Sequence, residues 1–447
     1  MHNVTVIGGG FAGVEAAWQL ANRGVAVTLY EMKPARFSPA HSSDALAELV
    51  CSNSFKAMRL GCAAGLLKAE MEALGSLCVA CAKETAVPAG GALAVDRARF
   101  SALVTARIAA RPEITLVREE VTALPADGTV IVAAGPLASP AISDAIAALC
   151  GGSLSFFDAA APIVSAESVD MDFAFTQSRY DRGDPEDYIN CPMNKAEYEA
   201  FYEALISAES APLHDFDRRK GVYEGCMPIE VMASRGHDTI RFGPMKPAGL
   251  RDPRTGHRPW ANLQLRKENA AGTMYNLVGF QTNLKFPEQQ RAFSMIPALH
   301  RAEFLRFGVM HRNTFLDAPR VLGSDFGCRL RPGLYFAGQI TGVEGYMESA
   351  ASGLLAGVNA ARSLQGKPPF LPAAETMLGA LARYVSDGAI RDYQPMGASF
   401  GLLPPLETKI RDKKLRCEAL SARALQHLQD DIHRQGINEE ERNEVFL

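Results

Sequence analysis

The sequence has no hydrophobic run long enough to form a membrane-spanning helix. Such a helix needs about 18 consecutive apolar residues, whereas the most apolar stretch, residues 131–150, contains Gly135, Pro140 and Asp144. No basic and apolar leader segment precedes the first predicted strand, which begins at Val4. We therefore expect a soluble, cytoplasmic protein without a membrane partner.

A large excess of charge of one sign is also missing. The 46 basic and 50 acidic residues give a formal net charge of -4, which argues against a general polyanion binder and leaves only local patches for contact with nucleic acid. Internal repeats and low-complexity tracts are absent as well. With 447 residues, 47% of them hydrophobic, the chain is long enough for two or three domains around a large core.

The nine cysteines provide no metal-binding framework. Cys78 and Cys81 form a C-x-x-C pair, but no second pair and no H-x-x-x-H motif completes a tetrahedral zinc site. We therefore expect no bound metal. In a cytoplasmic protein of this size, the cysteines are expected to be free thiols, most of them buried.

The stretch that organises the chain runs from Val4 to Glu31. A β-branched run ends in Gly8, Gly10 and Gly13, an apolar periodic segment follows, and a second predicted strand ends at Glu31. The glycines have the G-x-G-x-x-G spacing of a strand-turn-helix that binds the pyrophosphate of a dinucleotide. A carboxylate at Glu31 can accept hydrogen bonds from both hydroxyls of an adenosine ribose, which favours FAD or NAD over NADP.

The segments that follow are consistent with the same fold. A helix is expected at 61–77, and two strands are expected at 114–121 and 129–133. The second of these strands ends near Gly135. In flavoproteins of the two-dinucleotide-binding class, strands in this order contribute backbone to the adenine site and end at a glycine.

A closing segment of this fold is predicted near residue 330. A buried strand at 334–337 leads through Gly338 and Gln339 into a helix of small residues at 349–362. A glycine-rich loop that opens a helix presents N–H groups and a positive dipole end to a phosphate or to the anionic edge of a flavin, although small residues also serve plain helix packing. Because only one complete fingerprint is present, NADPH or NADH would have to enter transiently.

The composition changes between about residues 151 and 330, where aromatics, prolines and methionines are frequent and helix-strand alternation stops. The prediction is an α/β protein. It has an FAD-binding Rossmann-like domain of the glutathione-reductase type made of residues 1–150 and 331–365, an inserted α+β substrate domain at 151–330, and a helical C-terminal segment at 366–447.

Two cysteines are candidates for a reactive thiol. Cys226 lies in a turn-rich part of the insert, and because a thiolate needs nearby positive charge, basic groups from elsewhere would have to offset Glu224 and Glu230. Cys51 lies in a polar loop next to the expected flavin site and is the better candidate for an exposed thiol. On spacing alone, a buried structural thiol remains the alternative for both.

A local excess of positive charge occurs between Arg235 and Arg258, a segment that contains six basic residues and two acidic ones. Such a segment can contact a phosphate backbone, and Tyr180, Trp260 and Tyr275 could stack on unpaired bases. A solvated loop face without a ligand is the alternative.

Several long motifs occur in order along residues 4–362. They include AELVCSNSFKA, VPAGGALAVDR, YEGCMPIEVMA, YNLVGFQTNLK and AGQITGVEGYMESAASGL. With these motifs the chain resembles the TrmFO family of folate-dependent, flavin-containing tRNA uracil C5 methyltransferases. The last motif is also similar to the flavin-closing motif of MnmG, a tRNA wobble-uridine modifier with a much longer helical C-terminal region.

The resemblance implies a reaction. NADPH or NADH reduces FAD, and the methylene of 5,10-methylenetetrahydrofolate passes by way of the flavin to C5 of the T-loop uridine in the tRNA T-arm, leaving tetrahydrofolate. The family's two functional cysteines match Cys226, expected to add to uracil C6, and Cys51, expected to act as a base or to protect the one-carbon adduct. Tyr346 is expected to stack on folate or flavin, or to serve as a core aromatic.

Two groups of binding residues are predicted. FAD is expected to contact Gly8, Gly10, Phe11, Ala12, Gly13, Glu31, Met32, Val121, Gly135, Gly338, Gln339 and Ile340. RNA is expected to contact Arg241, Lys246, Arg251, Arg291 and Arg312.

Several alternatives remain open at this point. The same chemistry on a uridine of ribosomal RNA, or an MnmG-like modification of a wobble uridine, would need the same flavin site. A small-molecule flavin oxidoreductase would need neither Cys226 nor the basic insert. A flavin-containing RNA-binding protein without catalysis would bind RNA equally well after Cys226 is replaced.

Overall fold

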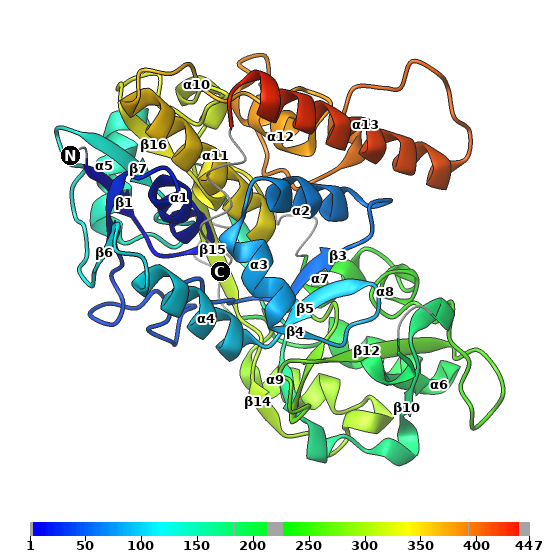
Figure 1. Ribbon diagram of the computed structural model, residues 1–447. Helices are drawn as coiled ribbons and strands as arrows, with labels where there is room; N and C mark the ends of the chain where they lie inside the picture. Colours follow the sequence, from blue (N-terminus) through cyan, green and yellow to red (C-terminus); the bar gives the residue numbers. More distant parts are fainter. Residues whose placement is uncertain (1–2, 153, 182–183, 212–226, 392, 438–447) are drawn as a thin grey trace.

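Two large hydrophobic clusters organise the protein. The computed structural model describes residues 3–152, 154–181, 184–211, 227–391 and 393–437. The larger cluster combines side chains from residues 4–146 and 315–437, and the smaller one draws its side chains from residues 164–302. We call the part of the protein around the larger cluster the first body and the part around the smaller cluster the second body, or insert. Figure 1 shows the second body, mostly green, below the first. The chain therefore begins in the first body, passes through the second and returns to the first.

The first body is built on a parallel sheet. Its strands within the described chain are β1 (Asn3–Ile7), β2 (Ala26–Tyr30), β6 (Ile114–Val117), β7 (Thr129–Val132) and β16 (Leu334–Phe336), in the spatial order β16-β7-β1-β2-β6. All neighbouring pairs are parallel. Ligands of such sheets bind beyond the carboxyl ends of the strands, where the predicted glycines follow β1, β7 and β16. The predicted strands near 130 and 335 are confirmed, whereas the predicted strand at 114–121 ends earlier, at Val117.

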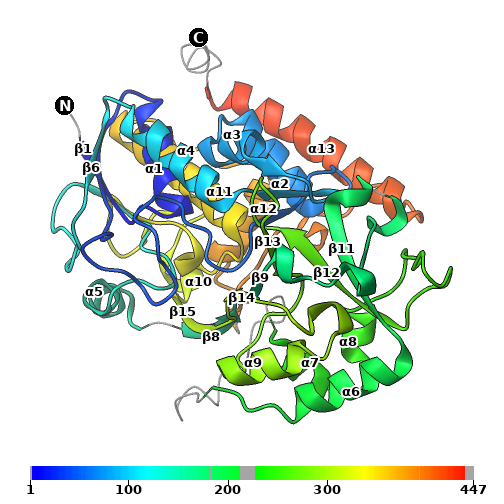
Figure 2. The same ribbon diagram turned by 90° about the horizontal axis from the view of Figure 1, so that it is seen from below.

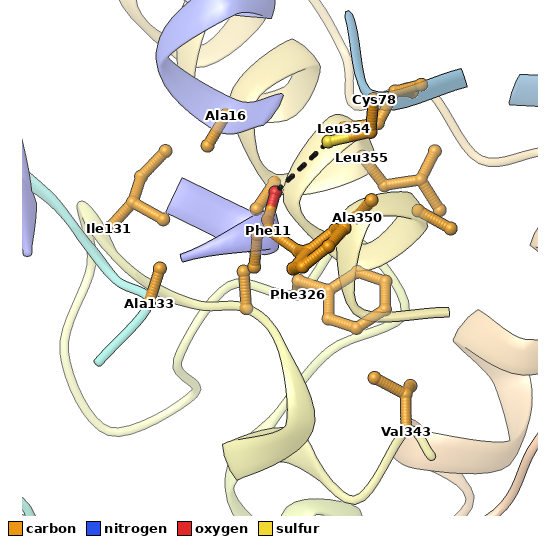
Figure 3. Close-up of a cluster of buried hydrophobic side chains, with 14 of the residues drawn as sticks. Phe11, Ala16, Cys78, Ile131, Ala133, Phe326, Val343, Ala350, Leu354 and Leu355 are labelled. Carbon is orange, nitrogen blue, oxygen red and sulfur yellow. Dashed lines mark hydrogen bonds between the residues drawn. The ribbon is translucent and has the colours of Figure 1, made fainter. Parts of the chain in front are cut away.

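Helices α1 (Phe11–Ala21) and α11 (Tyr346–Leu364) pack closely against each other. A Cβ on Gly353 would lie 2.1 Å from the carbonyl oxygen of Ala12, and one on Gly357 would lie 2.6 Å from another backbone oxygen of α1. The small residues of α11 therefore let the two backbones approach. Figure 3 shows side chains of both helices in one apolar cluster with Ile131 of β7 and with Ala133, which follows that strand; the helix residues include Phe11, Ala16, Ala350 and Leu354.

The helix predicted at 61–77 is wrong as a single element. The structure has α2 (Ala63–Ala73) and α3 (Leu77–Glu84) instead. Gly75 adopts a φ of +72°, and the side chain of Ser76 accepts a hydrogen bond from the N–H of Val79, so the chain turns and a new helix begins with its own cap.

A small antiparallel sheet that the sequence pattern did not predict lies beside these helices. It consists of β3 (Ser54–Ala57), β5 (Ala92–Val95) and β4 (Ala86–Val87), in the order β3-β5-β4. Helix α4 (Arg97–Ala109) follows β5, and Asp96 caps it by accepting from the N–H of Arg99. Helix α5 (Pro140–Cys150) follows β7.

Two paired strands connect the bodies. Strand β8 (Leu154–Ala159) leads into the insert and β15 (Met310–Phe315) leads back, and the two run antiparallel. The insert contains a sheet in the order β10-β11-β12-β13-β9-β14. Its strands are β9 (Ile163–Ser165), β10 (Phe175–Thr176), β11 (Tyr188–Met193), β12 (Ala261–Lys267), β13 (Met274–Leu277) and β14 (Phe304–Arg306). Its helices within the described residues are α6 (Lys195–Ile206), α7 (Ile229–Ser234), α8 (Thr239–Phe242) and α9 (Phe286–Phe293).

One face of the insert sheet is polar although it is buried. In β12, Leu263 and Leu265 belong to the smaller hydrophobic cluster, while Asn262, Gln264 and Arg266 alternate with them and point to the opposite face. Figure 2 shows α6, α7, α8 and α9 on the side of this sheet away from the first body. The polar face is therefore turned toward the first body.

The C-terminal segment forms helices that cover α2. The short α10 (Ala318–Val321) precedes β16, and after α11 come α12 (Met377–Ser386) and α13 (Lys413–Arg434), which Figure 1 shows in orange and red above α2. The buried carboxylate of Glu70 in α2 accepts hydrogen bonds of 2.8 Å from the first two N–H groups of α12. No helix in the described part of the chain combines the length and apolar composition that a membrane crossing requires.

Candidate active site

A first cavity lies beyond the carboxyl ends of β1, β2 and β7. Its empty volume is about 1090 Å³, part of it open to solvent. Most of the predicted FAD residues line it: Gly8, Gly10, Phe11, Ala12, Glu31, Met32, Val121, Gly135, Gly338 and Gln339. Gly13 and Ile340 do not line this cavity, because Gly13 packs against the backbone of Gly8 and only 3% of Ile340 is exposed.

The three glycines of the fingerprint have different physical roles. A Cβ on Gly8, whose φ is +105°, would lie 2.4 Å from the carbonyl oxygen of Ala133, and a Cβ on Gly13 would lie 1.8 Å from that of Gly8. A Cβ on Gly10 would meet no protein atom within 4 Å. Gly8 and Gly13 are therefore required by the fold, whereas Gly10 keeps free the space that a pyrophosphate would occupy.

The N-termini of two helices open into this cavity. Helix α1 begins after Gly10 and α11 begins after Gly345, and neither of these residues provides a side-chain cap. The first turns therefore present free N–H groups and the positive ends of two helix dipoles to the cavity. This arrangement fits FAD, because α1 can bind the pyrophosphate and α11 the anionic edge of the flavin ring.

Glu31 is held in place at the far end of the cavity. Its Oε2 accepts from the N–H of Gly9 at 2.9 Å, and its Oε1 accepts from the N–H of Lys33 at 3.0 Å. A carboxylate fixed in this way is suited to the ribose hydroxyls of the adenosine half.

A second cavity adjoins the first, and Tyr346 lines both. The second cavity is lined by Cys51 and by residues of the insert sheet, including Arg266 and Asn276. Lys56, Glu344 and Glu348 form another part of its wall. Two potential binding spaces thus meet at the segment that carries Cys51.

Tyr346 is bonded directly to this segment. Its hydroxyl oxygen accepts from the N–H groups of Val50 and Cys51, both at 2.9 Å, and lies 3.1 Å from the Sγ of Cys51. The two N–H groups occupy both lone pairs of the oxygen, so the hydroxyl proton is available for the sulfur. Burial and the neighbouring Cys51 raise the pKa of Tyr346 well above its ordinary value, which keeps that proton in place. The geometry therefore makes Cys51 a hydrogen-bond acceptor, as a thiolate requires.

Arginines fix the Cys51 segment against the insert. Arg266 of β12 donates to Ser52 Oγ and to Asn53 Oδ1, both at 3.0 Å, and Asn53 Nδ2 donates to the carbonyl of Lys267 at 2.8 Å. Arg97, at the start of α4, forms an ion pair with Glu268 of the insert and donates to the carbonyl of Leu49. The loop from 49 to 53 is thus held by groups from both bodies.

These arginines are functional candidates that the sequence analysis missed. Arg97 follows the capping Asp96 in the motif VPAGGALAVDR, which drew attention only to the family resemblance. Arg266 lies in a strand whose polar residues alternate with leucines, and that alternation was an available indication of a polar sheet face.

The buried thiols of the described chain are poor candidates for chemistry. The cysteines of the described chain are all free, and five of them are buried: Cys78, Cys81, Cys191, Cys328 and Cys417. Burial raises the pKa of Cys78 well above its ordinary value and that of Cys81 to about 12, so neither thiol ionises readily. Within the described residues, no three His, Cys, Asp or Glu side chains are grouped as metal ligands.

Comparison with known proteins identifies the family. The family model described as Glucose inhibited division protein A matches residues 3–368. A curated methylenetetrahydrofolate–tRNA-(uracil-5-)-methyltransferase TrmFO from Heliobacterium modesticaldum is 56% identical over 95% of this chain and 97% of the relative. The protein of that name from Geobacter sulfurreducens is also 56% identical, over 95% of this chain and 98% of its own length. The chain belongs to the TrmFO family.

Solved structures support the same fold. Two crystal forms of GidA from Aquifex aeolicus superpose with TM-scores of 0.69 and 0.70. The alignments cover 98% of this chain and 74% and 77% of the GidA chains, at 16% and 17% sequence identity. At this identity the likeness shows only that this TrmFO-family chain shares the fold of GidA.

The second cysteine that is matched to the TrmFO family, Cys226, lies outside the described residues. The described chain resumes at Met227. Three positions after Cys226, the N–H of Ile229 donates to the carbonyl of Gln281 at 2.7 Å, and Gln281 lines the second cavity.

The predicted RNA contacts have different surroundings in this TrmFO-family structure. Arg241 lies over the ring of Trp260, 3.8 Å from its centre, and donates to its carbonyl, while Arg291 forms an ion pair with Glu288. Lys246 and Arg251 are exposed. The side chain of Arg312 is outside what the structure describes.

One part of the RNA prediction is wrong. Tyr275 is only 7% exposed and belongs to the smaller hydrophobic cluster, so its ring cannot stack on a base without disrupting that core. Tyr180 is 56% exposed and remains a candidate for stacking.

Proposed function

We propose that this chain methylates C5 of the T-loop uridine of tRNA, with 5,10-methylenetetrahydrofolate as one-carbon donor and FAD reduced by NADPH or NADH. The observation that carries the proposal is the position of Tyr346, which lines both cavities and bonds to Cys51 where they meet. Such geometry suits a transfer between two bound molecules. Identity of more than half of the residues to relatives named for this reaction supports it.

The residues of the first cavity hold the cofactor. When bound, FAD supplies reducing equivalents and carries the one-carbon unit. The N-terminus of α1 binds the pyrophosphate, Glu31 accepts hydrogen bonds from the adenosine ribose, and backbone at Val121 lies by the adenine. The N-terminus of α11 stabilises negative charge on the flavin ring. Because the sequence holds one complete dinucleotide fingerprint, the nicotinamide cofactor binds only transiently.

Two thiols activate the uracil in this proposal. C5 of uracil is a poor nucleophile until a thiolate adds to C6, and Cys226 has that role. Cys51 accepts the proton that leaves C5, because the hydroxyl of Tyr346 stabilises its thiolate. The loop that carries Cys51 needs a fixed position for this step, which the hydrogen bonds of Arg266 provide.

The partners follow from this chemistry. The target base must leave the folded tRNA elbow to reach the second cavity, and Lys246 and Arg251 of the insert neutralise backbone phosphates nearby. Arg241, Arg291 and Arg312 are further candidates for such contacts. Tetrahydrofolate is released as the second product, and a tRNA substrate places the reaction in the cytoplasm.

The test is incubation of the holoprotein with NADPH, 5,10-methylenetetrahydrofolate and unmodified tRNA, followed by nucleoside analysis. We expect 5-methyluridine at the T-loop position, dependent on folate and abolished in Cys226→Ala. Methylation of ribosomal RNA instead, or modification of a wobble uridine, would replace the proposed target. If neither RNA gains a methyl group, the proposed reaction is wrong.

The same experiment separates the other classes of function. A small-molecule flavin oxidoreductase would turn over fully without folate and RNA. A non-catalytic RNA-binding flavoprotein would bind tRNA equally well as wild type and as Cys226→Ala, and would form no covalent complex with RNA that contains 5-fluorouracil.

A further inference from the structure

A buried hydrogen-bond donor in the second cavity has no acceptor. Asn276 lines this cavity, is only 3% exposed, and its Nδ2 has no partner within the described chain. Leaving a buried amide donor unpaired costs stability, so such a group usually bonds to a partner from outside the chain, either an ordered water or a ligand.

Asn276 belongs to a row of donors that crosses the insert sheet. The strand register places Arg266 of β12 opposite Asn276 of β13, Asn276 opposite Ile163 of β9, and Ile163 opposite Arg306 of β14. Directly paired residues project from the same face of a sheet, and the pairing of Arg306 follows a shift of register between Phe304 and Arg306. The Nε and Nη2 of Arg306 are also buried without partners among the described residues. The row therefore offers several N–H groups to one side and no carboxylate.

The row faces the segment that carries Cys51. Arg266 donates from its Nε to Asn53 and from its Nη2 to Ser52, both close to Cys51 in the chain. These two groups therefore fix that segment rather than a ligand. Asn276 is left as the neighbouring donor in the cavity wall. Its free N–H group thus lies in the wall of the space that Cys51 also lines.

We infer that Asn276 donates a hydrogen bond to the C4 oxygen of the target uracil and stabilises the negative charge that develops there. This inference rests on the proposed function. When a thiolate adds to uracil, an S–C6 bond forms, the electron pair of the C5=C6 bond moves toward C4, and the carbonyl pair moves onto the C4 oxygen. A donor that is already oriented in a buried site stabilises this charge strongly.

The chemistry of the row favours uracil over the pterin ring of the folate. Uracil presents two ring carbonyl oxygens on either side of its N3–H group, so donors match two of the three polar groups on that edge. A pterin presents one ring carbonyl beside an amino group and a ring N–H, which need a carboxylate acceptor. The carboxylates of the second cavity, Glu344 and Glu348, are bonded to Gln339 and Lys56 in another part of the wall.

The test compares wild-type holoenzyme with Asn276→Leu and Asn276→Asp in methyl transfer to tRNA. Both variants lose the donor, and Asn276→Asp keeps the shape of the side chain. We expect kcat to fall on the order of 100-fold in both, with the KM for 5,10-methylenetetrahydrofolate and the flavin content unchanged. Because Asn276→Leu removes an unpaired buried donor, its melting temperature without substrate should be equal to or above that of wild type. Asn269→Leu, in the turn that follows β12, is the matched control and should retain full activity.

Each outcome has a distinct meaning. A kcat close to that of wild type in a folded, flavin-loaded variant overturns the inference. A loss of activity that comes with a higher KM for folate and is overcome by more folate also overturns it, because the donor then serves the pterin. If wild type itself transfers no methyl group, the proposed function fails instead, and the variants are compared by exchange of uracil H5 with deuterated water in the absence of folate. That exchange needs only thiolate addition at C6, addition of a deuteron at C5, loss of H5 as a proton and elimination of the thiolate, so equal rates in wild type and variants would overturn the inference independently.

Discussion

The hydroxyl of Tyr346 lies 3.1 Å from the Sγ of Cys51, a residue 295 positions earlier in the chain. The tyrosine comes from the first turn of α11, which lines the first cavity, and the cysteine comes from a loop with no regular structure. One hydrogen bond therefore links α11, which lines the first cavity, to the thiol of the neighbouring cavity.

Replacing Tyr346 by phenylalanine tests this link. The ring keeps its contact with Phe11, but the N–H groups of Val50 and Cys51 lose their acceptor, which costs about 1–3 kcal/mol of stability. We expect alkylation of Cys51 by iodoacetamide, followed by peptide mass spectrometry, to slow and to shift to higher pH. Tyr384→Phe, which removes an exposed hydroxyl bonded to the carbonyl of Gln394, is the control. An unchanged alkylation profile would contradict the assigned hydrogen-bond direction.

The fingerprint glycines allow a prediction that separates folding from binding. Gly13→Ala places a Cβ 1.8 Å from a backbone oxygen, so we expect a large fall in melting temperature and loss of flavin. Gly10→Ala meets no protein atom, so the protein should melt as wild type does and yet retain little FAD. Melting curves and the flavin absorbance of purified protein measure the two effects. Normal flavin content in Gly10→Ala would place the pyrophosphate elsewhere.

The ion pair between Arg97 and Glu268 is expected to join the two bodies energetically. The side chain of Glu268 is 1% exposed, so Glu268→Gln leaves the guanidinium largely buried without its counter-charge, at a cost of about 3–5 kcal/mol. Urea unfolding measures this change. Glu288→Gln, which breaks an exposed pair with Arg291, should have almost no effect. Equal losses in the free energy of unfolding for the two substitutions would show that the buried pair stabilises the protein no more than the exposed one.

The contact between α2 and α12 is expected to depend on pH. Burial raises the pKa of Glu70 from its ordinary value of about 4.5 to about 8. Between these two pH values, Glu70 is protonated in the folded state and ionised in the unfolded state. The stability that Glu70 contributes is therefore complete below that ordinary value and is lost as the pH rises toward 8. We expect the difference in melting temperature, wild type minus Glu70→Gln, to decrease as the pH is raised from 5 to 9. A constant difference across this range would show that Glu70 does not titrate in this way.

The exposed cations of the insert are expected to contact RNA phosphates. The double variant Lys246→Ala with Arg251→Ala should weaken tRNA binding and lower the slope of log Kd against log salt by about 2. Filter binding over a range of salt concentrations measures this slope. The matched control is Lys413→Ala with Lys414→Ala, at the exposed start of α13. A slope that changes only in the control would move the RNA surface to the C-terminal helix.

Local patterns explain which elements were predicted. The unit from Gly8 to Glu31 depends on contacts between residues that are close in the chain, because strand, turn and helix lie in one continuous segment. The same holds for β7 and β16, where short β-branched or aromatic runs end near glycines. The helix predicted at 61–77 was wrong because the periodic pattern continued through a turn that Gly75 and Ser76 form.

Long-range contacts explain what the sequence could not provide. The side chains of Arg97 and Glu268 are 171 positions apart, and no periodicity indicates that they meet. Tyr275 was a plausible partner for a base in sequence, but the insert packs it into its core. Its exposure depends on which elements cover β13, and that is a property of the whole fold.

By itself the sequence determined a strand-turn-helix unit of the dinucleotide-binding type and, through its motifs, the family. Both depend on the order of residues that are close together in the chain. Only the tertiary structure decided which groups share the second cavity. Tyr346 meets Cys51 there, and Arg266, Asn276 and Arg306 form one row across the insert sheet. The physical reason is that strand register and the packing of two separate cores, rather than spacing along the chain, bring these donors and the thiol to the same place.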